Sequence, residues 1–205
     1  MKSIGRETLL NRIPQKYKLF IPREKELFTA LDVLNLEGIS DELKISVVEI
    51  TGFIHSDILN EFACVCAERA LRRVEHPDPR SVAAIAAKRA WMKGEISDAE
   101  LAAASAAAWV AARQYALYSS PAVLRAGAWA AHAVAYSNDA EYIAIECADM
   151  AIWAALEATQ EDSEGFAGDS DMYAAMDASM AAERAWQVEE LKKMLREGEN
   201  NAGSN

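Results

Sequence analysis

Four side chains that could bind a ligand follow one another at helical spacing in the middle of the chain. Arg125, Trp129, His132 and Tyr136 are separated by four, three and four residues, which places them along one side of a helix. The two aromatic rings could stack on a ring of a ligand, the guanidinium could meet a phosphate or carboxylate, and the imidazole could form a hydrogen bond. This stripe predicts a polar pocket between helices, although side chains that pack in a core would show the same spacing.

Two further charged side chains fall within the apolar faces of predicted helices. In the helix expected over residues 139–159, Asp149 lies in the middle of one face and Glu146 at its edge. The apolar members of that face are Tyr142, Ile145, Ile152, Trp153 and Leu156. In the helix expected over residues 80–93, Arg89 shares a face with Val82, Ile85 and Met92.

A carboxylate that is buried without a partner is costly, so Asp149 is expected to meet Arg89, Arg113, Arg125 or a hydroxyl group. One interpretation is an internal salt bridge that holds alanine-rich helices in register. The other is a ligand pocket in which Arg89 and Asp149 join the stripe of four residues.

The spacing Glu146-Cys147-Ala148-Asp149 is similar to one half of the metal site of all-α nucleotide pyrophosphohydrolases. The other half needs a second pair of carboxylates, and Glu161 and Glu164 have the spacing but fall in a predicted loop. The sequence has no zinc-ligand spacing, no glycine-rich phosphate loop and no nucleophile beside a base. It therefore predicts no catalytic residue, no metal and no cofactor, and it favours a protein without enzymatic activity. A metal-dependent nucleotide hydrolase remains one alternative.

The helices that carry these residues are unusually rich in alanine. Ten of the 21 residues from 98 to 118 are alanine, the best intrinsic helix former, whose small side chain lets helix axes approach closely. Capping patterns mark helix starts at Asp78-Pro79, Ser97-x-x-Glu100, Ser120-Pro121 and Asn138-x-x-Glu141. We predict an all-α fold, either a multi-helix bundle or a short helical stack, with close-packed central helices and a long C-terminal helix over 171–196.

The chain is expected to divide into an N-terminal helical extension (residues 1–54), an alanine-rich domain (55–197) and a disordered tail (198–205). Within the extension we expect a short helix over 3–11, an irregular segment over 15–22 and a helix over 23–36. Residues 40–54 are expected to be helical, with Ser40 as the cap, although the β-branched residues from Ile45 to Ile50 would also suit an extended segment.

The net charge of −11 is concentrated in one half of the chain. Residues 1–95 carry 15 basic and 14 acidic side chains, whereas residues 96–205 carry 6 and 18. This disfavours double-stranded nucleic acid as a partner and suits a basic protein, although the acidic residues could serve solubility alone. Three cysteines without a disulfide framework predict a cytoplasmic protein, and no apolar run is long enough to cross a membrane. The alanine-rich surfaces suit a monomer or a homo-oligomer equally.

Two stretches of the sequence resemble a known family. The first is Phe62–Leu71 (FACVCAERAL), followed by Pro77–Arg80 (PDPR) and Lys93–Leu101 (KGEISDAEL), and the second is Ala182–Leu191 (AERAWQVEEL). Together with the alanine helices between them, over residues 55–196, they resemble the alanine-rich immunity proteins (the Imm-5-like group) and their relatives in phage genomes. The resemblance implies an all-helical fold and a role in neutralising a toxin or effector, and it supplies no catalytic residues.

The sequence therefore predicts a non-enzymatic binding protein of bacterial or phage conflict systems, which holds a protein effector or toxin. The stripe from Arg125 to Tyr136 supports one further alternative. In that alternative the protein is a phage counter-defence sponge that sequesters a small nucleotide-type immune signal.

Overall fold

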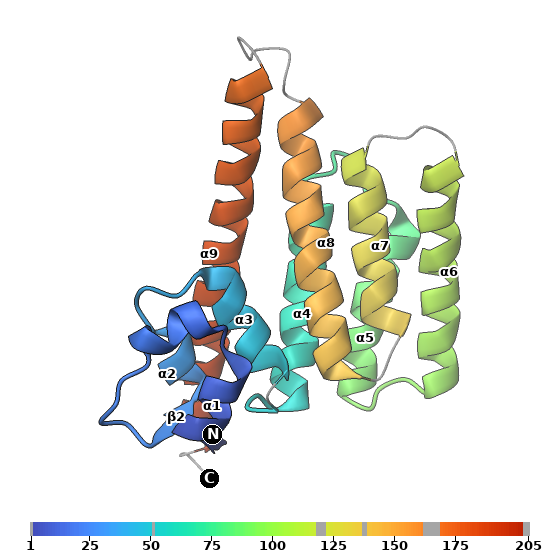
Figure 1. Cartoon of the computed structure of the whole chain (residues 1–205). Helices are drawn as coiled ribbons and strands as arrows, with labels where there is room; N and C mark the ends of the chain where they lie inside the picture. The colour runs from blue at the N-terminus through green and yellow to red at the C-terminus, as the bar shows by residue number, and fades with distance from the viewer. Residues whose placement is uncertain (1, 51, 118–121, 137–138, 162–168, 203–205) are drawn as a thin grey trace.

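The computed structural model describes residues 2–50, 52–117, 122–136, 139–161 and 169–202, and these residues form an all-α bundle (Figure 1). Four helices stand side by side, and two more cover one side of the row. The row consists of α6 (Asp98–Leu117), α7 (Ala122–Tyr136), α8 (Ala140–Glu161) and α9 (Asp169–Ala202). Behind it, α5 (Pro79–Met92) packs on α6 and α7, and α4 (Ser56–Leu71) packs on α7, α8 and α9. No helix among the described residues covers the other side of α7.

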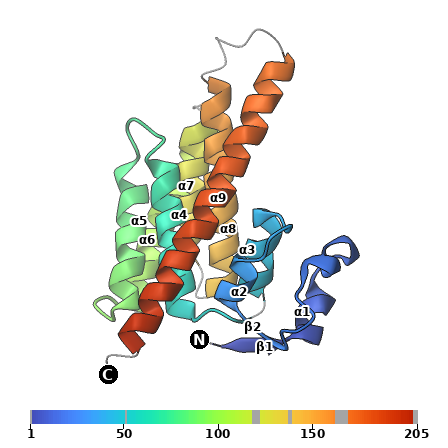
Figure 2. The same cartoon turned by 90° about the vertical axis from the view of Figure 1, so that its left-hand side faces the viewer.

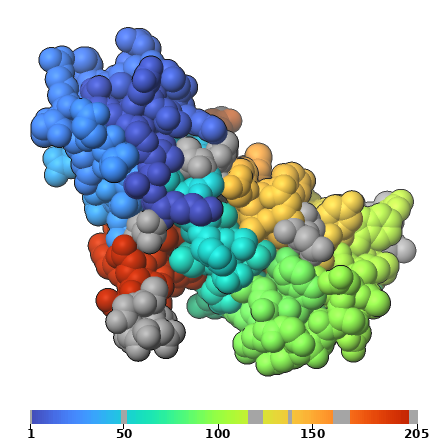
Figure 3. Space-filling model, turned by 90° about the horizontal axis from the view of Figure 1, so that it is seen from below, coloured from blue at the N-terminus to red at the C-terminus, as the bar shows by residue number. Residues whose placement is uncertain are grey.

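The N-terminal segment packs at the α9 end of this row. It consists of β1 (Ser3–Gly5), α1 (Arg6–Arg12), the 3-10 helix η1 (Gln15–Phe20), β2 (Leu27–Thr29), α2 (Ala30–Leu34) and α3 (Asp41–Ile50). The strands pair antiparallel with Ile4 opposite Phe28, and α2 and α3 contact α9. Figure 2 shows α9 crossing in front of α4 and α8 beside this segment, and Figure 3 shows α5 and α6 at the opposite end of the molecule. One hydrophobic core runs from Leu9 to Leu195, so the N-terminal segment shares it with the bundle.

The helix predicted over 23–36 is wrong in its first half. Residues Leu27–Thr29 form a strand because they pair with β1, and the helix begins only at Ala30. Thr29 caps this helix: its hydroxyl accepts a hydrogen bond from the Asp32 backbone N–H, and its own backbone N–H donates to the Asp32 carboxylate. At the other end of the chain, α9 continues through residues 198–202, which were expected to belong to a disordered tail.

Most of the helix starts are those that the sequence predicts. The Asp78 carboxylate accepts from the Arg80 backbone N–H, Ser97 and Glu100 form a capping box, and Ser40 caps the helix over 41–50. Asp139 caps α8, one residue after the predicted position. The predicted cap at Ser120-Pro121 lies outside the described residues.

The buried side of α8 is its alanine side, so the predicted phase of this helix is wrong by about half a turn. The buried residues are Ala140, Ile143, Ala144, Cys147, Ala148, Ala151, Ala154 and Ala155. Tyr142 and Trp153, which were expected to pack inside, are 51% and 52% exposed. Alanine and cysteine face α4 because helices that pack through small side chains can approach closely, and this leaves the bulky residues on the outer side.

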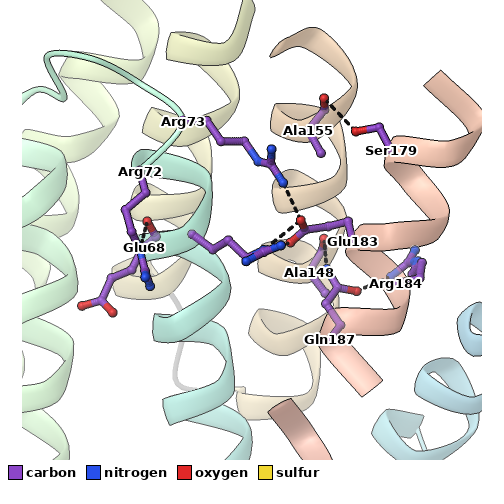
Figure 4. A network of polar contacts seen from close by, with 10 residues as sticks. Glu68, Arg72, Arg73, Ala148, Ala155, Ser179, Glu183, Arg184 and Gln187 are labelled. Carbon is purple, nitrogen blue, oxygen red and sulfur yellow. Dashed lines mark hydrogen bonds and ion pairs between the residues drawn. The ribbon is translucent and has the colours of Figure 1, made fainter. Parts of the chain in front are cut away.

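A buried polar network fastens α9 to α4 and α8 (Figure 4). The Glu183 side chain is fully buried and accepts hydrogen bonds from Arg69 at 2.8 Å, in the last turn of α4, and from Arg73 at 2.6 Å, just beyond that helix. The Arg69 guanidinium also lies 4.1 Å from the centre of the Trp186 ring. Toward α8, the Gln187 amide donates to the Ala148 carbonyl at 2.9 Å. These contacts orient α9 along its central turns, where it has few large apolar side chains.

We expect Glu183→Ala to lower the free energy of unfolding by about 3–5 kcal/mol, because it leaves two arginines beside an empty buried position. Urea denaturation followed by circular dichroism measures this loss. The control is Glu189→Ala on the same helix, whose 67% exposed carboxylate pairs with Lys192 and should contribute less than about 1 kcal/mol. Equal losses in the two variants would contradict a fastening role for Glu183.

A second buried carboxylate, Asp78, joins the start of α5 to α6. It accepts from the Arg80 side chain at 2.7 and 2.9 Å and from the Tyr115 hydroxyl at 3.0 Å, while Arg80 also donates to Gln114. The hydrogen bonds from Arg80, more than any other contact, lower the pKa of Asp78 to about 2. This contact holds the start of α5 against α6.

We expect Asp78→Asn to lower the free energy of unfolding by about 2 kcal/mol at neutral pH, because asparagine keeps the cap and loses the charge. The carboxylate has a folded pKa below its ordinary value of 3.8, so its stabilisation is complete above that value and is lost as the pH falls through about 2. The difference between variant and wild type should therefore shrink from pH 5 to pH 2 in urea titrations. The exposed Asp57→Asn is the control, and a difference that stays constant with pH would contradict the prediction.

Candidate binding face

Three of the four residues in the sequence stripe lie together on the uncovered side of α7. The Trp129 and His132 rings meet edge to face with their centres 5.9 Å apart, and the His132 and Tyr136 rings are 5.3 Å apart. Tyr136 is 71% exposed and Trp129 is half-buried. The predicted helical phase of α7 is therefore confirmed, and its alanines face α4 and α5.

These three side chains form a ridge between two hollows. The hollow between α6 and α7, of about 490 Å³, is lined by Ala102, Ser105, Ala106, Trp109, His132 and Tyr136. The hollow between α7 and α8, of about 420 Å³, is lined by Trp129, His132, Ala133, Tyr136, Tyr142, Glu146 and Met150. We call these residues together the aromatic face. Among the described residues that line it, Glu146 is the only acidic or basic side chain apart from the imidazole of His132.

His132 is held as a neutral imidazole. Its Nδ1 lies 3.2 Å from the Ser105 carbonyl oxygen and 3.4 Å from the Ser105 hydroxyl. A carbonyl oxygen can only accept, so this contact assigns the proton to Nδ1 and leaves Nε2 as an acceptor. Burial lowers the pKa of His132, and the hydrogen bond to the carbonyl opposes that shift in part.

The pair of Ser105 and His132 does not form a hydrolytic dyad. The ring nitrogen nearest the Ser105 hydroxyl already carries a proton, so it cannot take the proton of that hydroxyl. Only 5% of Ser105 is exposed, where it lines the hollow between α6 and α7. The two side chains instead connect α6 to α7 beneath the aromatic face.

Glu146 gives the hollow between α7 and α8 its charge. It lies one turn after Tyr142 on α8, and its negative charge, with a hydrogen bond between the two side chains, raises the pKa of the Tyr142 hydroxyl. Tyr136 adds to the same effect from α7. The three groups therefore place oxygen atoms and negative charge at one edge of the aromatic rings.

The other predicted site residues lie elsewhere. Arg125 is half-buried on α7 and is not among the residues that line the two hollows. Arg89 bridges α5 to α4 through Glu61 at 2.7 Å and through Glu68. This bridge supports the interpretation that Arg89 is a structural residue rather than part of a pocket with the stripe.

The predicted partners of Asp149 are wrong. Its carboxylate pairs with Arg184 of α9 at 2.7 Å, and 47% of its side chain is exposed. It lies on the outer side of α8 for the same reason as Tyr142 and Trp153, because the alanines occupy the inner side. Arg184 in turn donates to Gln187, so this pair belongs to the contacts between α8 and α9.

The sequence stripe omits the residues that α6 and α8 contribute, chiefly Trp109, Tyr142 and Glu146. A usable signal was present, because Tyr142 and Glu146 are four residues apart and so share one side of α8. On α6, Ala102, Ser105, Ala106 and Trp109 repeat the spacing of one helix face. These patterns can be interpreted only after the alanine side of each helix is known to face inward.

The proposed carboxylate metal site is not assembled in the part of the chain that the structure describes. Glu146 faces the hollow, whereas Asp149 is paired with Arg184, and no group of three His, Cys, Asp or Glu side chains gathers there. The side chains of Glu161 and Glu164 lie outside the described set. Cys64, Cys66 and Cys147 are buried, and burial raises the pKa of the Cys64 thiol to about 12. Among the described helices, none combines the length and apolarity needed to span a membrane.

Comparisons with protein-family models, curated proteins and solved structures find no match to this chain. The stretches Phe62–Leu71 and Ala182–Leu191 meet in space, because Arg69 of the first pairs with Glu183 of the second and stacks on Trp186. Their unusual residues hold helices together and lie apart from the aromatic face.

We expect Asp149→Ala to lower the free energy of unfolding by about 1 kcal/mol or less, because the pair with Arg184 is half exposed to solvent. A buried pair would cost about 3–5 kcal/mol instead. Thermal and urea denaturation of the single variant separate the two values. A loss in the higher range would show that the charge is buried in solution.

Proposed function

We propose that this protein is a non-enzymatic binding protein that holds a basic protein effector, and that the aromatic face is the surface that holds it. One observation carries the proposal: two hollows side by side expose aromatic rings next to a carboxylate, over three helices. The exposed rings are those of Trp109, Tyr136 and Tyr142, with Trp129 half-buried between them.

The composition of this face is that of a protein interface. Tryptophan, tyrosine and methionine are enriched where proteins meet, and they supply most of the binding energy when they fill pockets. Large exposed apolar surfaces are uncommon on proteins that have no partner. The hollows of about 420 and 490 Å³ are concave enough to receive side chains of a partner.

The charge around the face indicates a basic partner. Residues 126–183 contain twelve carboxylates and no lysine or arginine. A field of one sign attracts a partner of opposite charge and speeds its association. A nucleotide would meet Glu146 in one hollow and no lysine or arginine among the described lining residues of either. The sponge alternative therefore has less support than a protein partner, and the resemblance to immunity proteins favours a toxin or effector.

The test is capture and neutralisation of an effector by variants of the face. We expect Tyr136→Ser combined with Tyr142→Ser to weaken binding at least about tenfold and to abolish rescue of cells that express the effector. The matched control is Tyr173→Ser, which removes a 60% exposed tyrosine from α9, away from the face. The measurements are affinity capture from the native host and growth during co-expression with a candidate toxin.

Three outcomes would count against the proposal. The captured effector could be acidic, or it could bind the double variant as well as the wild type. Alternatively, heating the purified protein could release a nucleotide that mass spectrometry detects, which would favour the sponge. Circular dichroism must first show that the double variant is folded.

A further inference from the structure

We propose that the hollow between α7 and α8 is a cage for the guanidinium group of an arginine side chain, which the partner inserts when it binds. This inference rests on the proposed function and names the chemistry of its central contact. It depends on the residues that the two helices bring together: Trp129 and Tyr136 from α7, and Tyr142 and Glu146 from α8.

Three aromatic rings line this hollow from two sides. Trp129 and Tyr136 come from one helix and Tyr142 from the next, and both tyrosines are more than half exposed. The face of an aromatic ring attracts a cation, and several rings around one hollow form the arrangement that proteins use to bind organic cations. A cationic group can therefore reach these rings from solvent.

Glu146 supplies the opposite charge within the same hollow. No ion pair among the described residues involves this carboxylate, and its described partner is the Tyr142 hydroxyl. The raised pKa of Tyr142 reflects the negative charge that collects there. An incoming cation would thus find a carboxylate that the described part of the chain leaves without a cationic partner.

A guanidinium fits this combination better than an ammonium group. It is planar, so it can stack on an aromatic ring, and its N–H groups can still donate to a carboxylate in the plane of the stack. An ammonium group is compact and more strongly hydrated, and it cannot make both contacts in this way.

The protein already uses this chemistry inside its own fold. Arg69 lies 4.1 Å from the centre of the Trp186 ring and donates to Glu183 at 2.8 Å. Arg113 lies 4.8 Å from the centre of the Trp109 ring at the edge of the aromatic face. The hollow between α7 and α8 holds the ring and carboxylate parts of the first arrangement, and its described lining residues include no arginine.

The experiment titrates the full-length protein with N-acetyl-arginine methylamide and follows the indole N–H resonances by NMR. The neutral control is N-acetyl-citrulline methylamide, which has the same shape without the charge. The Trp129→Phe variant assigns the Trp129 resonance. We expect a saturable shift of that resonance with the arginine probe, a much smaller shift with citrulline, and about fivefold weaker binding in Glu146→Gln. Glu157→Gln, about three turns further along the same side of α8, should bind as the wild type does.

Equal shifts with the two probes, or unchanged binding in Glu146→Gln, would overturn the cage. The cage could fail while the double variant Tyr136→Ser, Tyr142→Ser still shows weaker binding to a basic effector. In that case the proposed function stands without the cage. If the arginine probe binds as expected and no basic effector is captured, the proposed function fails and the cage stands. Circular dichroism confirms that Glu146→Gln is folded, which its half-exposed position should allow.

Discussion

Close packing of helices through small side chains is the constraint on which this structure depends. The buried side of α8 consists of alanines with Ile143 and Cys147, and α7 turns its own alanines and Gly127 toward α4. A Cβ atom at Gly127 would lie 3.0 Å from Cδ2 of Leu71, so even alanine there would require the Leu71 side chain to shift by a few tenths of an ångström. Since the interior has little room, aromatic side chains of α6, α7 and α8 remain at the surface. The aromatic face is therefore a consequence of how the core is built.

Small side chains bury little apolar area per residue, so polar contacts have to fix the angles between the helices. Glu183 holds α9 against α4, Arg89 holds α5 against α4, and Asp78 holds the start of α5 against α6. Glu183 meets Arg69 and Arg73, which lie 114 and 110 residues away along the chain, whereas Arg89 and Asp78 connect helices that follow one another. Arg69, Asp78 and Glu183 lie within the stretches Phe62–Leu71, Pro77–Arg80 and Ala182–Leu191, so the polar residues of these stretches hold helices together.

The sequence predicts the class of fold and most helix boundaries, because capping residues act locally. Asp78, Ser97 and Ser40 each begin a helix where their chemistry favours one. The phase of α8 could not be predicted by the usual rule that large apolar residues face inward. Tyr142 and Trp153 are exposed and Ala148 is buried, because the spacing between the helices decides which side chains fit inside. The partner of Asp149 and the strand at Leu27 depend on contacts with distant residues, which local patterns do not contain.

The interval between Lys93 and Lys192 contains no lysine, and α6, α7 and α8 lie wholly within it. Acylation or ubiquitination of lysine therefore cannot modify the aromatic face, whatever the state of the cell. Amine-reactive reagents are equally unable to label it. In a complex with a basic partner, the amines at this contact belong to the partner and the carboxylates to this chain. A zero-length amide cross-link formed at this contact would therefore join a lysine of the partner to a carboxylate of this chain such as Glu146.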